Sequence, residues 1–126
     1  MDTDLDGEPE TTLVGDRYGS VVAADGLGKR LFSVYTSIGD MAFAAGDVDG
    51  DGRVEVVAGS STGDLVCARY PQGDVLWRFD NFGYPVKRLR TADLNGDGRQ
   101  EVVVASGTGY LYVLDGAAQV LWQDRA

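Results

Sequence analysis

Near the middle of the chain lies the acidic stretch Asp47-Val-Asp-Gly-Asp-Gly-Arg-Val-Glu55. The same spacing, D-x-[DN]-x-D-G-x-x-E, occurs in Asp2-Thr-Asp-Leu-Asp-Gly-Glu-Pro-Glu10 and in Asp93-Leu-Asn-Gly-Asp-Gly-Arg-Gln-Glu101. The three stretches begin 45 and then 46 residues apart, and a fixed period of this length is typical of repeat architectures. The sequence therefore predicts three tandem units, at about residues 1–38, 39–83 and 84–126.

Short apolar runs follow each acidic stretch in the same order. The first run comes directly after it, as in Glu55–Ser60 and Glu101–Ser106, and a glycine turn leads to a second run. A later turn leads to a third run, which contains Leu76-Trp77 or Leu121-Trp122. Each run has about five or six residues, is rich in Val, Leu, Tyr and Trp, and is bounded by Gly, Asp or Asn. This pattern indicates β-strands.

A fourth short segment precedes two of the acidic stretches, at residues 41–45 and 86–92; the first unit lacks it, because the chain begins inside its acidic stretch. Four strands in about 45 residues is the size of one propeller blade, and the glycine connections at 59–63 and 107–109 suit antiparallel hairpins. We therefore predict an all-β fold of three tandem four-stranded antiparallel β-propeller blades, the first lacking its innermost strand. A β-sandwich is the alternative, but it does not require one motif at one repeated position.

Charge and composition exclude several classes of partner. Acidic residues outnumber basic ones by 20 to 11, and the formal net charge is −9. Nucleic acid is not expected as a partner, because phosphate neutralisation requires clustered Lys and Arg. No apolar run approaches the ~18 residues of a transmembrane helix, so membrane insertion is not expected either. With no His and one Cys, the chain lacks the usual zinc ligands, the commonest general base and any disulfide framework.

The acidic stretches have the donor groups of a calcium site. Side chains at positions 1, 3 and 5 of a tight loop can face one point, and Gly at position 6 allows a sharp bend. Position 7 offers a backbone carbonyl and position 9 a closing carboxylate, and Ca²⁺ prefers six to eight such oxygens. We therefore expect up to three Ca²⁺ ions. The expected ligands are Asp2, Asp4, Asp6, Glu8 and Glu10 in the first stretch, Asp47, Asp49, Asp51, Arg53 and Glu55 in the second, and Asp93, Asn95, Asp97, Arg99 and Glu101 in the third, with Glu8, Arg53 and Arg99 contributing backbone carbonyls.

Other interpretations of these loops fit less well. An EF-hand needs Glu at position 12 and flanking helices, but position 12 is Leu13, Ala58 or Val104 and the flanks are predicted strands. Mg²⁺ retains its waters and prefers fewer carboxylates. The simplest alternative is that Asp and Gly only form turns, which the threefold identical spacing makes unattractive.

The three sites are not expected to be equal. The second stretch carries four carboxylates at the ligand positions and is flanked by strands on both sides, so it should bind most tightly. The third has the neutral Asn95 at a position where the second has Asp49. The first contains Pro9 and lies at the N-terminus, where order is least certain.

The residues Phe43-Ala-Ala-Gly-Asp-Val-Asp-Gly-Asp-Gly-Arg-Val-Glu-Val-Val-Ala-Gly59 resemble an FG-GAP repeat, the blade of the integrin α-subunit propeller. The pattern is also similar to VCBS-type repeats of bacterial proteins and to some fungal propeller lectins. The resemblance covers essentially the whole chain. It implies a calcium-stabilised propeller module with a structural, adhesion or ligand-binding role, a protein or glycan ligand, an extracellular or cell-surface location and no enzymatic activity.

Two alternatives to this function remain. The residues Gly109-Tyr-Leu-Tyr-Val-Leu-Asp-Gly116 and Val120-Leu-Trp122 also resemble the tryptophan-docked blades of quinoprotein dehydrogenases. The chain could therefore be part of a quinoprotein-like or polysaccharide-active propeller enzyme. An engineered self-assembling propeller fragment is the other alternative.

Three blades cannot close a propeller ring, which usually has about seven in this family. Blade faces at the two ends would stay exposed, and large apolar patches usually become interfaces. We therefore expect a homo-oligomer that closes the ring, a dimer first and a trimer second. Phe32, Trp77 and Trp122 occupy equivalent positions and are expected to pack between blades, with a sugar-stacking surface as the alternative. Cys67 lies inside a predicted strand and is expected to be buried.

Overall fold

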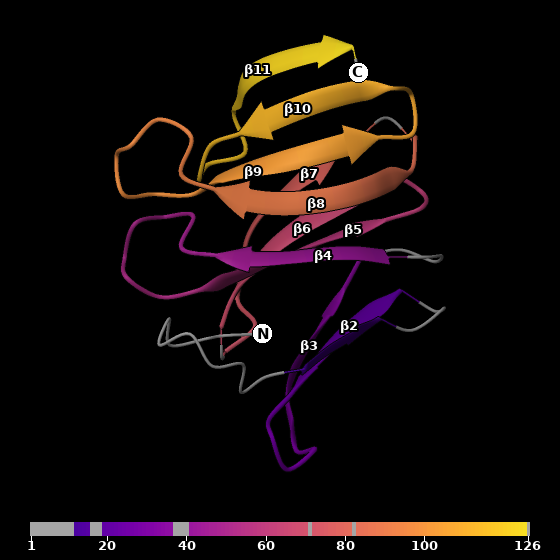
Figure 1. The fold of residues 1–126 in the computed structure, drawn as a ribbon. Helices are drawn as coiled ribbons and strands as arrows, with labels where there is room; N and C mark the ends of the chain where they lie inside the picture. The colour runs from indigo at the N-terminus through magenta and orange to yellow at the C-terminus, as the bar shows by residue number, and fades with distance from the viewer. Residues whose placement is uncertain (1–11, 16–18, 37–40, 71, 82, 126) are drawn as a thin grey trace.

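The computed structural model describes residues 12–15, 19–36, 41–70, 72–81 and 83–125 of the chain. Within these ranges the chain forms eleven β-strands and no helix (Figure 1). Their bounds are β1 Thr12–Gly15, β2 Ser20–Ala24, β3 Arg30–Tyr35, β4 Met41–Gly46, β5 Glu55–Ser60, β6 Asp64–Arg69, β7 Val75–Asp80, β8 Val86–Ala92, β9 Glu101–Ser106, β10 Tyr110–Leu114 and β11 Val120–Arg125.

The strands form three antiparallel sheets in the order of the sequence repeats. The sheet order is β1-β2-β3 in blade 1, β4-β5-β6-β7 in blade 2 and β8-β9-β10-β11 in blade 3. The registers repeat as well, because Leu13 pairs with Ala23 and Val57 with Cys67 at equivalent positions. The predicted fold is confirmed, and the described residues of blade 1 form three of the four strands.

The three blades stack through their faces, with blade 2 between the other two (Figure 1). One apolar cluster joins blade 2 to blade 3 and contains Val57, Leu65 and Cys67 from blade 2. A second cluster joins blade 2 to blade 1 and contains the intervening residues Val56 and Val66. Since successive side chains of a strand point to opposite faces, blade 2 contributes alternate residues to the two clusters. This explains why all six residues of β5 are buried.

We call the face of a blade toward the following blade its front face, and the opposite face its back face. Phe32 lies on the front face of blade 1, 7% exposed, and packs edge-to-face on Tyr70 of blade 2. Trp77, on the front face of blade 2, is partly buried and packs against the cluster between blades 2 and 3. The expected packing between blades is therefore confirmed for these two residues. Trp122, on the front face of blade 3, is 50% exposed, because no described residue covers that face.

Cys67 is fully buried in the front face of blade 2, as the sequence predicts. Burial raises the pKa of its thiol, because the thiolate would lose its hydration. The side chain therefore acts as a small apolar group.

Leu65→Ala tests the contribution of the packing between blades 2 and 3. Leu65 is completely buried, so its truncation should lower the free energy of unfolding by about 2–5 kcal/mol. Leu27→Ala is the matched control, because Leu27 is 96% exposed and the same truncation should stay within about 0.5 kcal/mol. Urea unfolding monitored by tryptophan fluorescence measures both. Equal losses would contradict the packing described here.

Candidate metal centre

The second and third acidic stretches form the connections between the first and second strands of blades 2 and 3. Loop 2, residues 47–54, joins β4 to β5, and loop 3, residues 93–100, joins β8 to β9. In both loops the Gly at position 6 has a positive φ, 83° at Gly52 and 87° at Gly98. This left-handed conformation favours glycine and confirms the predicted bend. The first acidic stretch, with the predicted ligands Asp2, Asp4, Asp6, Glu8 and Glu10, lies outside the described residues.

Carboxylates hold loop 2 together by accepting backbone hydrogen bonds. The two oxygens of Asp47 accept from the amides of Gly50 and Gly52, at 2.7 and 2.9 Å. Asp49 Oδ1 accepts from the amide of Asp51 at 3.0 Å. The Asp49 bond is that of an Asx turn, which forms without any metal, and the two Asp47 bonds extend over three and five residues. The Asp residues therefore form the turn. Carboxylate oxygens that accept none of these hydrogen bonds can face the loop centre.

Loop 3 repeats this arrangement bond for bond. Asp93 accepts from the amides of Gly96 and Gly98, at 2.7 and 3.0 Å. Asn95 Oδ1 accepts from the amide of Asp97 at 3.1 Å. Asn95 therefore accepts the same turn-forming hydrogen bond as Asp49. At this position the two loops differ in charge, because Asn95 is neutral.

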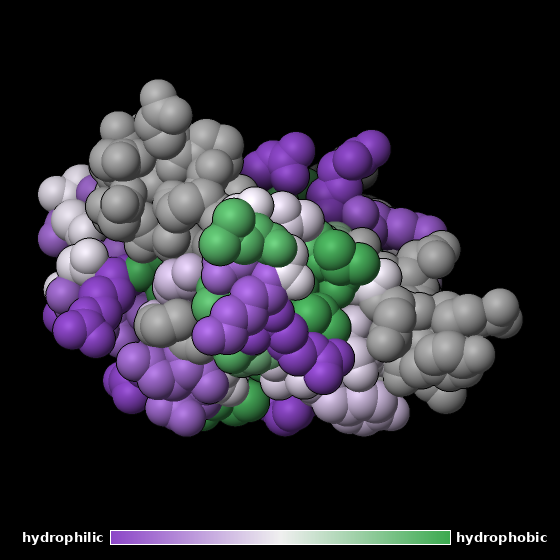
Figure 2. Space-filling view, turned by 90° about the horizontal axis from the view of Figure 1, so that it is seen from below, coloured by the Kyte–Doolittle hydropathy of each residue, from purple (hydrophilic) through white to green (hydrophobic). Residues whose placement is uncertain are grey.

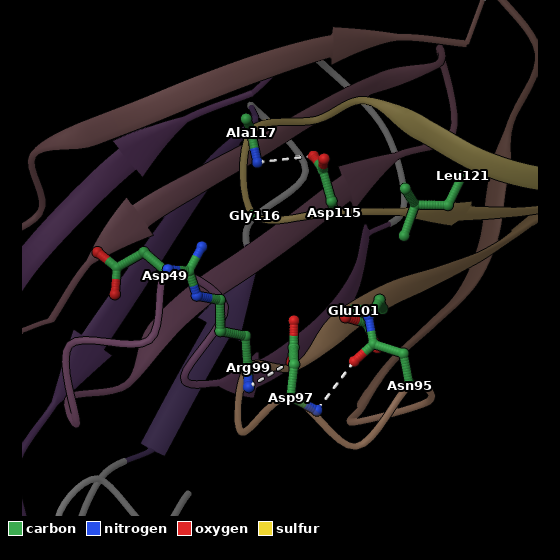
Figure 3. Close-up of a pocket in the computed structure, with 9 residues that line it drawn as sticks. All are labelled: Asp49, Asn95, Asp97, Arg99, Glu101, Asp115, Gly116, Ala117 and Leu121. Atoms are coloured by element: carbon green, nitrogen blue, oxygen red, sulfur yellow. Dashed lines mark hydrogen bonds between the residues drawn. The ribbon is translucent and has the colours of Figure 1, made fainter.

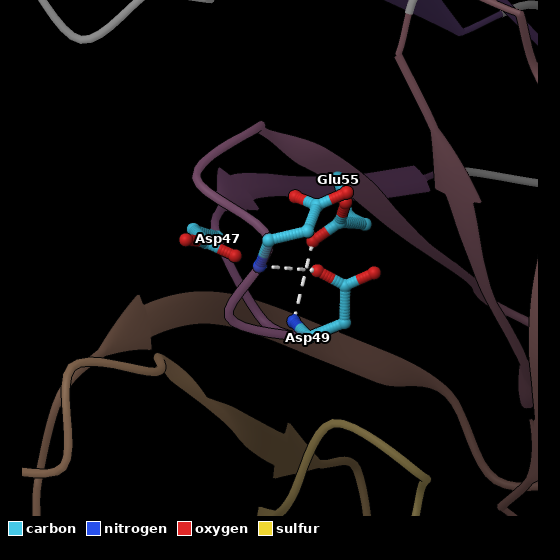
Figure 4. Close-up of side chains that lie close together, drawn as sticks. Asp47, Asp49 and Glu55 are labelled. Atoms are coloured by element: carbon cyan, nitrogen blue, oxygen red, sulfur yellow. Dashed lines mark hydrogen bonds between the residues drawn. The ribbon is translucent and has the colours of Figure 1, made fainter.

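A buried glutamate closes each loop at position 9. Glu55 is 1% exposed, and its Oε2 accepts from the amide of Val48 at 2.9 Å. It also accepts from the amide of Asp49 at 3.4 Å (Figure 4). Glu101 is 4% exposed, and its Oε2 accepts from the amide of Leu94 at 2.7 Å. The Glu side chain thus connects the start of each loop to the strand that follows it.

The structure brings together seven of the ten predicted ligands that it describes. In loop 2, carboxylate oxygens of Asp47, Asp49, Asp51 and Glu55 all lie within 4.8 Å of one another. In loop 3, the carboxylates of Asp93, Asp97 and Glu101 meet the same limit. Arg53 and Arg99 donate their backbone amides to the preceding Asp, at 2.8 Å each. The predicted use of their carbonyls as ligands stays a prediction.

Glu55 shows the electrostatic cost of loop 2. Its Oε1 is buried and has no hydrogen-bond partner among the described residues. Burial, together with the charges of Asp49 and Asp51, raises the pKa of Glu55 from its ordinary value of 4.5 to about 7, although the hydrogen bonds from the two backbone amides lower it. A buried acceptor without a donor, beside three carboxylates, is the environment that a hard cation would satisfy. The residues of loop 2 therefore fit a calcium ion.

Sequence reasoning missed the residues that surround the loops. Arg69, at the end of β6, lies 3.7 Å from Asp49 Oδ2, and its side chain is 49% exposed. Such an exposed pair contributes little. A hollow of about 350 Å³ lies beside loop 3, between its carboxylates, Asp49 and the turn that contains Asp115 (Figure 3). The recurrence of Asp-Gly at 25–26 and 115–116 was the signal in the sequence that could have identified this turn.

Blade 3 covers loop 2 from the side. The Gln100 amide donates to the Asp47 carbonyl at 2.8 Å, and Thr91 Oγ1 donates to the Ala45 carbonyl at 2.7 Å. Gly116 packs so closely on loop 2 that a Cβ there would overlap the Val48 carbonyl oxygen. Loop 2 is thus part of the interface between blades 2 and 3.

No helix in the described ranges has the length and apolar character needed to cross a membrane.

Comparison with known proteins supports the interpretation of the repeats. Residues 41–76, which contain loop 2, match the FG-GAP repeat, and residues 72–126 match the λ-carrageenase β-propeller domain. No curated protein matches the chain in sequence. The crystal structure of BamB from Moraxella catarrhalis matches 94% of this chain with a TM-score of 0.70 and 17% identity. The chain spans 33% of the length of BamB, and at this identity the likeness shows the fold alone.

The raised pKa of Glu55 predicts a pH dependence of stability in metal-free buffer. Because the folded state holds the Glu55 proton more tightly than the unfolded state, the stability from this group is complete below pH 4.5 and is lost as the pH rises through about 7. Glu55→Gln removes this loss. Between pH 5 and 8, the free energy of unfolding of the variant relative to wild type should rise by up to about 3 kcal/mol. Urea unfolding at several pH values tests this, and parallel pH profiles would contradict it.

Proposed function

We propose that the chain is a calcium-binding β-propeller module with a structural, adhesion or ligand-binding role. The observation that carries this proposal is the buried Oε1 of Glu55, which lacks a partner in the described structure and lies beside three loop carboxylates. When bound, Ca²⁺ supplies positive charge that offsets the repulsion among these carboxylates. Asp47, Asp49, Asp51 and Glu55 would hold it in loop 2.

The residues of loop 2 have two roles, since some fix the backbone of the loop and others supply negative charge. Asp47 fixes the bend through its two backbone hydrogen bonds, and Glu55 ties the loop to β5. In loop 3, Asp93, Asp97 and Glu101 would hold the ion with one formal charge fewer, together with the amide oxygen of Asn95. We propose up to three ions in all, the third in the first acidic stretch.

A rigid connection between the first and second strands of each blade would be the structural consequence. Metal binding to the folded state alone contributes directly to folding stability. The proposed ligand is a protein or a glycan bound at a face of the propeller, in an extracellular or cell-surface setting where calcium is at millimolar concentration. We assign no catalytic role to the chain itself.

A polysaccharide-related role is the second candidate. The match of residues 72–126 to the λ-carrageenase β-propeller domain favours it over the quinoprotein alternative. The module would then support a carbohydrate-active protein. Binding to a panel of neutral and sulfated oligosaccharides, measured by calorimetry in the presence of calcium, would distinguish this role from protein adhesion.

Calcium should raise the melting temperature. At a calcium concentration about 10- to 100-fold above the dissociation constant, each site contributes about 1.4–2.7 kcal/mol, which corresponds to several degrees for a chain of this size. Thermal scans in chelator, in calcium and in the same concentration of Mg²⁺ measure the effect. Glu55→Gln/Glu101→Gln should lose most of the response. Identical midpoints in chelator and in millimolar calcium would contradict calcium binding.

Two reciprocal substitutions separate charge from loop geometry. Asp49→Asn and Asn95→Asp both keep the side-chain oxygen that accepts the backbone hydrogen bond. Because calcium affinity depends on ligand charge, Asp49→Asn should weaken binding at loop 2 by about tenfold, and Asn95→Asp should strengthen it at loop 3 by a similar factor. Calorimetric titration of each variant tests both. Unchanged affinities would show that the loops serve only as turns.

A further inference from the structure

The front face of blade 3 is an apolar surface without a cover among the described residues. It forms a groove of about 520 Å³, lined mainly by Leu94, Val103, Leu111, Val113, Leu121 and Trp122. Leu94 is 57% exposed, whereas Val48, at the same position of loop 2, is 0% exposed. The difference arises because blade 3 covers Val48.

The interface between blades 2 and 3 shows how such a face is covered. The indole N–H of Trp77 donates to the Gly116 carbonyl at 3.1 Å. Gly116 belongs to the turn between β10 and β11 and lies against the Val48 carbonyl, where a side chain would not fit. A tryptophan on one blade is therefore received by an Asp-Gly turn on the next.

Blade 1 carries the same turn. Asp25 Oδ1 accepts from the amides of Leu27 and Lys29, both at 2.9 Å. Asp115 Oδ1 accepts from the amides at the two equivalent positions, also both at 2.9 Å. The backbone bonds agree as well, from Asp25 N to Lys29 O at 2.9 Å and from Asp115 N to Gln119 O at 3.0 Å. Gly26 therefore occupies the position of Gly116.

The corresponding turn of blade 2 differs and receives a different side chain. It runs from Arg69 to Asp74 and is one residue longer. Its Gly73 lies against the Phe32 ring, and Tyr70 packs edge-to-face on that ring. Within this chain, the longer turn thus pairs with Phe and the Asp-Gly turn pairs with Trp. Among the described residues, Trp122 has no Asp-Gly turn packed on it. The Asp-Gly turn of blade 1 likewise has no tryptophan packed on it.

The back face of blade 1 also has suitable side chains. The strand pairs Thr12–Ala24 and Val14–Val22 stand where blade 2 has Val56–Ala68 and Ala58–Val66. All four of these blade 2 residues are buried against blade 1, whereas Val14 is 55% exposed. Viewed from the blade 1 end of the molecule, several apolar side chains are exposed near the middle of the surface, with hydrophilic side chains between them (Figure 2).

We propose that the front face of blade 3 binds the back face of blade 1 in a second copy of this chain. Trp122 then packs on the turn that contains Gly26 of the partner subunit, as Trp77 packs on Gly116. The contact is heterologous, because it joins two different faces. When each of two copies contributes both faces to the other, the two contacts close a ring of six blades. The interface centres on Trp122 and Leu94. The outer end of this interface is polar, because Asp124 of blade 3 lies at the position that Phe79 occupies in blade 2.

Light scattering coupled to size exclusion tests the assembly at chain concentrations from about 5 to 200 μM. We expect a species of twice the 13.4 kDa chain mass at the upper end. Trp122→Arg should weaken association by about thirtyfold or more, as a central tryptophan of an interface does. Tyr84→Arg is the control, because Tyr84 is 52% exposed in the connection between β7 and β8 and its substitution should leave association unchanged. Circular dichroism and cooperative thermal unfolding establish that each variant folds.

A mixing experiment tests the head-to-tail geometry. Trp122→Arg disrupts only the binding surface on the front face of blade 3. Gly26→Val disrupts only the binding surface at the turn of blade 1. Each variant alone should be monomeric, whereas an equimolar mixture should form a heterodimer through the two intact faces. A defined trimer of the wild type would support the same interface with a larger ring. A wild-type chain that stays monomeric at 200 μM, an assembled Trp122→Arg, or a mixture that remains monomeric would each overturn the proposal.

Discussion

The packing of one blade's front face on the next blade's back face is the constraint on which the rest of this structure depends. A three- or four-stranded sheet has two faces, and within the described structure only blade 2 has both of them covered. Its strands β5 and β6 are consequently the most deeply buried, and their small and branched side chains meet blade 1 and blade 3 on alternate positions. Stability in such an array is carried by interfaces between neighbours more than by each unit alone.

The acidic loops are placed by the same packing. Loop 2 lies at the edge of the interface with blade 3, where Gln100 and Gly116 contact its backbone. A loop with this much negative charge would be expected at an exposed position, yet its closing residue, Glu55, is buried. The burial has a structural benefit, because the Glu55 carboxylate fixes the Val48 and Asp49 amides. It also has an electrostatic cost, which appears as the raised pKa. The same carboxylate thus stabilises the turn and supplies the buried negative charge that the proposed Ca²⁺ would offset.

The sequence was sufficient to predict the blades because their signal is repeated. One strand run of five or six apolar residues is ambiguous, but the same run after the same acidic stretch two or three times is not. The clustering of the loop carboxylates was predictable for a related reason, since side chains at alternate positions of a tight turn can face one point. The seven carboxylates at the ligand positions of loops 2 and 3 indeed form two clusters.

Other features required three dimensions. The burial of Val48 depends on blade 3, whose Gly116 packs against the Val48 carbonyl from 68 residues further along the chain. The different exposures of Trp77 and Trp122 depend on which blade has a neighbour, although the local sequences Val-Leu-Trp are identical. The first acidic stretch matches the pattern as well as the other two, and its geometry stays a prediction.

The contacts of Val48 connect the loop with the blade interface. Its amide is held by Glu55, and its carbonyl lies against Gly116 of blade 3. An ion that stabilised loop 2 would therefore also stabilise the surface that blade 3 packs on, and by linkage the packing of blade 3 would strengthen ion binding at loop 2. Leu94 holds the equivalent place in loop 3, where Glu101 binds its amide but no described residue covers it. If another blade covered the front face of blade 3, ion binding at loop 3 and the packing of that blade would strengthen each other in the same way. The neutral Asn95 and the exposed Leu94 would both make loop 3 the weaker of the two proposed calcium sites, the first because of its charge and the second because no blade covers it.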